Sequence, residues 1–143
     1  MPSPLDAFLA RYDPEIAATA RAARAKLRKL LPGAFELVYD NYNALAIGYA
    51  PSDRTSEAIL SLALYPRWVT LFFLRGVTLD DPGRILRGSG KLVRHIVLED
   101  ARDLDRDDVR ALIAQATHGK SFANGKLIVK SISNNQRPRR PRG

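Results

Sequence analysis

A short run of the chain combines two glycines, a hydroxyl group, basic side chains and a histidine immediately before a β-branched apolar segment. Successive backbone N–H groups in a glycine-rich turn form a concave nest for an anion, and neighbouring cations add charge. The run RGSGKLVRHIVLED therefore predicts either a small-anion site or a structural turn that leads into a strand. Its candidate anion-binding residues are Arg87, Gly88, Ser89, Gly90, Lys91, Arg94 and His95.

The same run does not fit a phosphate-binding P-loop. That motif requires a second glycine five residues before the one that precedes the lysine, and a serine or threonine after the lysine. Ile85 and Leu92 occupy those two positions. In a regular strand, Arg94 and His95 would also point to opposite faces, so one ligand could not contact both side chains.

The sequence contains no complete catalytic constellation. It has no cysteine, which excludes disulfides, thiolate metal ligands and cysteine nucleophiles. His95 and His118 are far apart and have no carboxylate at metal-ligand spacing. No serine–histidine–acid arrangement can be singled out. The residues therefore favour a binding protein over an enzyme, with no catalytic or metal-ligating side chains assigned.

The formal net charge of +8 suggests an acidic partner, but much of it lies at one end of the chain. Without the final eleven residues, 19 of the 23 lysines and arginines remain against 15 acids, a surplus that is ordinary for solubility. The end itself predicts a flexible basic tail over residues 133–143, and it is a candidate contact for nucleic acid. Its arginines are Arg137, Arg139, Arg140 and Arg142.

Helical signals dominate the first quarter of the chain. Apolar spacing predicts a short helix within residues 3–12 and a longer one over residues 13–31, with an aspartate before its start and a proline in its first turn. Arg21, Arg24 and Arg28 share one face of the second helix. That face predicts either a solvated basic surface or a docking face for an acidic partner.

Strand patterns follow. The runs FELVYD, ALAIGYA, AILSLALY and WVTLFFL are separated by turn residues, and the short break between the third and fourth predicts an antiparallel hairpin. Both faces of the fourth run are apolar, which predicts a central strand covered on both sides. A helical turn is expected at residues 80–83, a strand over 92–98, a helix over 105–116 and a final strand over 126–132.

This order of elements predicts an α+β fold. We expect a two-layer sandwich in which the helical hairpin and the later helix pack on a mostly antiparallel sheet of about five to six strands. The sandwich forms one domain over residues 1–132. The opening residues do not have the pattern of a signal peptide, and no apolar run approaches the ~18 residues of a membrane span. We therefore expect a cytoplasmic protein without a membrane partner.

The chain resembles the YdhG-like family of bacterial domains over nearly its whole length. The resemblance rests on FLARYDPEIAATARAARAKLRKLLPGA, on YPRWVTLFFLRG, and on GSGKLVRHIVL with an acidic helix after it. One branch of that family is described as frataxin-like iron chaperones with a helix–sheet–helix sandwich. The resemblance therefore implies this fold and, by analogy only, iron as a cargo.

The residues depart from the frataxin pattern. Frataxin-type iron binding uses an acidic ridge along the first helix, because hard iron ions prefer clustered carboxylates. Here the helical hairpin is basic and would repel a cation. The acids gather instead in residues 99–108, the acidic segment, where arginines alternate with them and a helix start favours them. We expect these acids to stabilise the helix start and iron to bind weakly or not at all.

These observations favour a YdhG-like binding or carrier domain for a metal ion or a small anionic ligand. The alternative is an accessory nucleic-acid-binding protein that uses the arginine-rich tail and the basic helix face.

Overall fold

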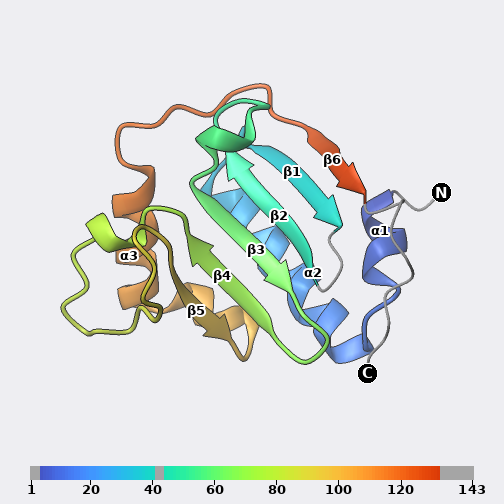
Figure 1. The fold of residues 1–143 in the computed structure, drawn as a ribbon, viewed down its shortest axis with the longest axis horizontal. Coiled ribbons are helices and arrows are strands. Elements are labelled where there is room, and N and C mark those ends of the chain that lie inside the picture. The colour runs from blue at the N-terminus through green and yellow to red at the C-terminus, as the bar shows by residue number, and fades with distance from the viewer. Residues whose placement is uncertain (1–3, 41–43, 133–143) are drawn as a thin grey trace.

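The computed structural model of this chain has one mixed sheet with helices against one of its faces (Figure 1). It describes residues 4–40 and 44–132. Within these residues the strand order is β5-β4-β3-β2-β1-β6, and all neighbours are antiparallel except β1 and β6. The predicted α+β sandwich is therefore confirmed. The elements are α1 (Pro4–Leu9), α2 (Pro14–Leu30), β1 (Phe35–Asp40), β2 (Leu45–Ala50), β3 (Leu60–Leu64), β4 (Val69–Phe73), β5 (Arg94–Leu98), α3 (Asp107–Thr117) and β6 (Leu127–Ile132), with short 3-10 helices η1 (Thr55–Glu57), η2 (Gly76–Thr78) and η3 (Ala101–Asp105).

The core lies between the sheet and α2, because both present apolar side chains at the required period. Across five strands, the row Val38, Ile47, Leu62, Leu71 and Ile96 is paired in register and buried. Alanines supply three of the four buried positions of α2, so the helix backbone can approach the sheet closely. Burial of each large side chain contributes about 1.5–3 kcal/mol to the free energy of folding.

The prediction that the fourth strand is covered on both sides holds in part: on its second face Thr70 is 2% exposed and Phe72 is partly exposed, but none of the described helices packs there (Figure 1). Strand β4 is an interior strand, but α2 and α3 lie behind the sheet in Figure 1 and cover only one of its faces. On the opposite face, Trp68 is 48% exposed and Val97 is 47% exposed. Apolar residues on both faces of a strand therefore did not mean that helices cover both faces.

Several element boundaries differ from the sequence-based expectation. Helix α1 ends at Leu9, and β5 begins only at Arg94. Residues 80–83 form a hydrogen-bonded turn rather than a helix, in which the Arg84 N–H donates to the Asp81 carbonyl at 3.0 Å. None of the helices in the described ranges is long and apolar enough to cross a membrane.

The last helix is preceded by a separate 3-10 helix because local side-chain bonds favour one there. Asp100 accepts a hydrogen bond from the Arg102 N–H at 2.8 Å, and Asp103 accepts one from the Glu99 N–H at 2.9 Å. Together with Asp103, Asp100 forms a capping box that starts η3. The chain then begins α3 at Asp107, two residues later than predicted.

Two glycines allow a close backbone contact between the end of α2 and the start of β6. The Gly125 N–H donates to the Gly33 carbonyl at 3.0 Å, and Gly33 has a φ of 86°. A Cβ at Gly125 would overlap the carbonyl of Ala34. The contact therefore places the residues before β6 directly beside the C-terminal end of α2.

We predict that Gly125→Ala lowers the free energy of unfolding by about 1–3 kcal/mol, because the added methyl group must displace backbone atoms. Gly90→Ala is the matched control, since its Cβ would have the Val93 carbonyl 4.0 Å away and φ at Gly90 is not positive. Urea denaturation of both variants measures the difference. Equal stability of Gly125→Ala and wild type would show that the contact is not a packing constraint.

Candidate anion-binding site

The glycine-rich run predicted as an anion site is a hairpin loop at the edge of the sheet. Arg87 and His95 exchange both backbone hydrogen bonds, at 2.8 and 2.9 Å, so residues 88–94 form the loop. Gly88 has a φ of 117°, whereas φ at Gly90 is not positive. Only one of these two glycines therefore adopts a positive φ, and the loop is wider than a tight turn.

Arg94 and His95, the last two candidate residues of this run, lie on opposite faces of the sheet, as strand alternation predicts. The Arg94 guanidinium folds back on the loop and donates to the carbonyls of Gly90 and Val93 at 2.6 and 2.9 Å. The His95 ring lies on the other face, 5.5 Å from the ring of Phe72. The structure thus brings Arg87, Gly88 and His95 together, and it holds Arg94 against the same loop, with its Cδ 3.6 Å from where a Cβ at Gly88 would lie. Anion binding by this loop stays a prediction.

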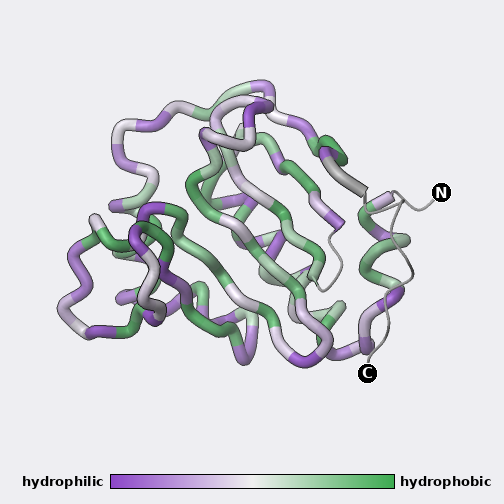
Figure 2. Tube along the Cα trace, viewed as in Figure 1, coloured by the Kyte–Doolittle hydropathy of each residue, from purple (hydrophilic) through white to green (hydrophobic). Residues whose placement is uncertain are grey.

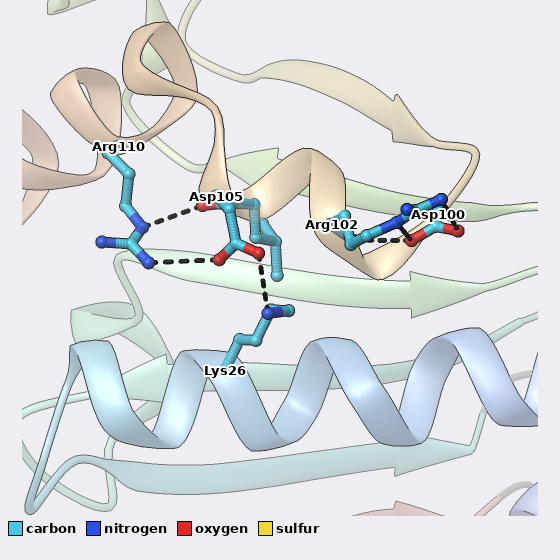
Figure 3. A network of polar contacts seen from close by, with 6 residues as sticks. Lys26, Asp100, Arg102, Asp105 and Arg110 are labelled. Atoms are coloured by element: carbon cyan, nitrogen blue, oxygen red, sulfur yellow. Dashed lines mark hydrogen bonds and ion pairs between the residues drawn. The ribbon is translucent and has the colours of Figure 1, made fainter.

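The acidic segment is bonded to basic side chains (Figure 3). Asp105 accepts hydrogen bonds from Lys26 of α2 at 2.8 Å and from Arg110 of α3 at 3.2 Å. The bond from Lys26 is the main reason that the pKa of Asp105 is lowered. The side chain of Arg102 likewise lowers the pKa of Asp100. In the part of the chain that the structure describes, no group of three or more His, Cys, Asp or Glu side chains could hold a metal ion.

The tail arginines predicted to contact nucleic acid lie outside the described residues.

A different group of basic side chains surrounds a cavity at the C-terminal end of α2. The cavity has a volume of about 550 Å³. Helix α2, strands β1 and β2, and the residues before β6 each contribute part of its wall. Its charged and polar lining consists of Arg24, Arg28, Lys29, Glu36, Tyr49 and Lys126.

The inner wall of this cavity is a buried ion pair. Glu36 is 5% exposed, and its carboxylate accepts hydrogen bonds from Arg24 Nε and Nη2, both at 2.9 Å. The Tyr49 hydroxyl donates a third bond at 2.9 Å. A buried carboxylate is tolerated only when it is paired in this way. We refer to Arg24, Glu36 and Tyr49 as the inner cluster.

Two members of the inner cluster have raised pKa values. The hydrogen bonds with Glu36 raise the pKa of Arg24. Burial, with the neighbouring Glu36 charge, raises the pKa of Tyr49 well above its usual value. Near neutral pH the arginine is therefore charged and the tyrosine is a hydrogen-bond donor.

The outer wall has an excess of positive charge. Arg28 Nε lies 3.9 Å from the nearer Glu36 oxygen, and its side chain is 62% exposed. Lys29 and Lys126 are exposed. Glu36 is the one carboxylate among the described residues that line the cavity, and Arg24 already compensates it. We refer to Arg28, Lys29 and Lys126 as the outer cations.

Part of this arrangement has a purely structural explanation. Arg28 and Lys29 lie in the last turn of α2, where cations interact favourably with the helix dipole. That explanation does not extend to Lys126, which precedes β6 and reaches the cavity through the Gly33–Gly125 contact. The three outer cations therefore line the cavity from α2 and from the segment that precedes β6.

Sequence reasoning identified only part of this site. It placed Arg21, Arg24 and Arg28 on one basic face, but Arg24 is half-buried and bonded to Glu36 rather than free on the surface. Alternation in FELVYD could have put Glu36 on the same face as the buried Val38. Its pairing with Tyr49 depends on strand register, which the local pattern does not give.

Comparisons of the chain with family models, with curated proteins and with solved structures found no match. The YdhG-like resemblance therefore stays an expectation from sequence.

We predict that Tyr49 destabilises the fold at alkaline pH. Its pKa in the folded state lies well above 10.0, so above pH ~10 the unfolded chain loses this proton first. The contribution of the protonated Tyr49 to the free energy of unfolding is fully present below pH ~10. It falls by about 1.4 kcal/mol for each pH unit above that value. Tyr49→Phe removes that loss, although it also removes one buried hydrogen bond worth about 1–3 kcal/mol at neutral pH.

Urea denaturation between pH ~8 and ~11 checks this prediction. Wild type should be the more stable protein at the lower pH. The difference in the free energy of unfolding between wild type and Tyr49→Phe should decrease as pH rises. A gap that does not change with pH would contradict a buried, protonated tyrosine.

Proposed function

We propose that this protein is a binding domain for a small anion with more than one negative charge, such as a phosphate compound, and that the outer cations hold it. One observation supports this most directly. Three basic side chains from two elements surround a concave site whose single carboxylate is already neutralised.

The inner cluster would form a rigid wall that keeps its position when the ligand binds. Arg24 is held by two hydrogen bonds to Glu36, so it would not move on binding. Arg28 is only loosely associated with Glu36, at 3.9 Å, and is free to turn towards an anion. Leu31, Ala34 and Leu127 add apolar wall, which lowers the local dielectric and strengthens charge–charge attraction. The volume falls within the range of about 300–1,000 Å³ that small-molecule sites occupy.

Of the two ligand types that the sequence suggested, the charges of this cavity favour an anion over a metal ion. A cation would meet Arg28, Lys29 and Lys126 at the entrance and one carboxylate already bonded to Arg24. Iron delivery, which the family resemblance implies by analogy, gains no support from this lining. Nucleic-acid binding through the tail remains the alternative function.

We predict that inorganic pyrophosphate binds the cavity and that Arg28→Ala and Lys126→Ala each weaken its affinity about tenfold, or ~1.4 kcal/mol. Arg21→Ala is the matched control, because it removes the same charge from an exposed position on α2 outside the cavity. Isothermal titration calorimetry gives the dissociation constants. Amide NMR shifts should fall on residues 28–34 and 125–127.

Two outcomes would contradict the proposal. An equal loss of affinity in Arg21→Ala would indicate non-specific attraction by net charge. Shifts confined to residues 87–95 would place the anion in the glycine-rich loop instead.

We also predict opposite effects of Glu36→Gln on binding and on stability. Removing the one carboxylate should tighten pyrophosphate binding, because Arg24 then adds its charge to the outer cations. The same change leaves Arg24 without its ionic partner and should lower the free energy of unfolding by about 1–3 kcal/mol. Calorimetry and urea denaturation on one preparation measure both effects. Weaker binding by a folded Glu36→Gln protein would mean that Glu36 itself contacts the ligand.

A further inference from the structure

The face of the sheet opposite α2 and α3 presents an ordered set of aromatic side chains. Figure 1 is viewed from this side, and the middle strands lie in front of both helices. Figure 2 shows apolar residues continuing along these strands. We refer to this surface as the open face.

Strand register defines the open face. Leu37, Gly48, Ser61, Phe72 and His95 form one row across β1 to β5, on the side opposite the buried core row. The residues in its middle are small, and the larger side chains stand at the two sides. Leu37 is 0% exposed and Gly48 is buried, so the accessible part of this row is limited to Ser61, Phe72 and His95 on β3, β4 and β5.

Two aromatic pairs stand on this face. Phe72 and His95 have ring centroids 5.5 Å apart and are both partly exposed. Tyr65 and Trp68 flank the hairpin between β3 and β4, with centroids 5.6 Å apart. Trp68 lies four residues from Phe72 along the chain, which separates the pairs by about 13 Å on the same face. Trp68 is 48% exposed and the other three rings are partly exposed, so part of each ring is accessible to a ligand.

Basic side chains border both aromatic pairs. Arg87 pairs with His95 across an antiparallel bridge, so its side chain is on the open face beside His95, which separates it from Phe72. Arg67 is exposed in the turn next to Trp68, and Lys91 is exposed in the loop that follows Arg87. Glu99, the first residue after β5, is an exposed acid that follows Leu98, the partner of Val69 in the sheet.

We infer that the open face binds single-stranded nucleic acid. Bases would stack on the two aromatic pairs, and Arg67 and Arg87 would contact phosphates at the border. Stacking on exposed rings combined with backbone neutralisation is the general mode of recognition for single strands, and it tolerates many sequences. A duplex hides the faces of its bases in the stack and offers this surface only phosphates. The inference does not depend on the anion cavity.

The single tryptophan of the chain makes the inference directly testable, since its fluorescence reports on Trp68 alone. The titrant is an oligothymidylate of about 12 nucleotides, within the length range of one stacking groove. We expect saturable quenching by this strand. A duplex and an abasic strand of equal length should bind much more weakly.

Two substitutions test the stacking contacts, with a labelled strand and anisotropy as the readout so that Trp68 can be replaced. Phe72→Leu and Trp68→Ala should each weaken binding about 5- to 150-fold. Val77→Ala is the control, because Val77 is an exposed apolar residue, at 46%, in η2 outside the aromatic rows. Arg87→Ala should reduce the slope of log affinity against log salt by about 0.7.

Three results would overturn the inference. Unchanged affinity in both ring variants would place binding on the tail or on α2. Equal affinity for the abasic strand would reduce the effect to phosphate attraction. Concentration-dependent self-association that Trp68→Ala abolishes, with no response to the oligothymidylate, would identify a second copy of the chain as the occupant.

Discussion

The burial of Glu36 between the sheet and α2 is the constraint on which the rest of the site depends. A carboxylate that is 5% exposed needs a countercharge and hydrogen-bond donors, and Arg24 of α2 supplies the charge while Tyr49 of β2 adds a hydrogen bond. The bidentate bond links α2 directly to β1. It also uses the only negative charge among the described cavity residues, so the basic residues of the next helical turn have no acid of their own in this cavity.

The second constraint is geometric. Strand β6 pairs in parallel with β1 after the chain has passed through α3, and the contact between Gly33 and Gly125 sets where that return begins. Lys126 follows directly and completes the basic wall from the opposite side. The basic residues of α2 and the closely packed segment before β6 therefore line the same cavity, although they are far apart in sequence.

The sequence predicted what local periodicity determines and missed what depends on pairing between distant segments. Alternation in WVTLFFL identified the two faces of β4, and helical spacing identified the buried side of α2. Neither pattern could show that one face of β4 lacks a helix, because that depends on where α3 packs. Likewise, RGSGKLVRHI is a compact motif that can be recognised in the sequence. Glu36 and Tyr49 are adjacent only because of the register of β1 on β2, which the sequence pattern does not give.

A crystal of the protein soaked in selenate would test the central claim most directly, since the anomalous signal of selenium locates a doubly charged anion without assumptions about its position. The account predicts one strong peak among Arg28, Lys29 and Lys126, with Glu36 still bonded to Arg24 and Tyr49. A cavity without a peak, or Arg24 turned away from Glu36 to reach the anion, would contradict it.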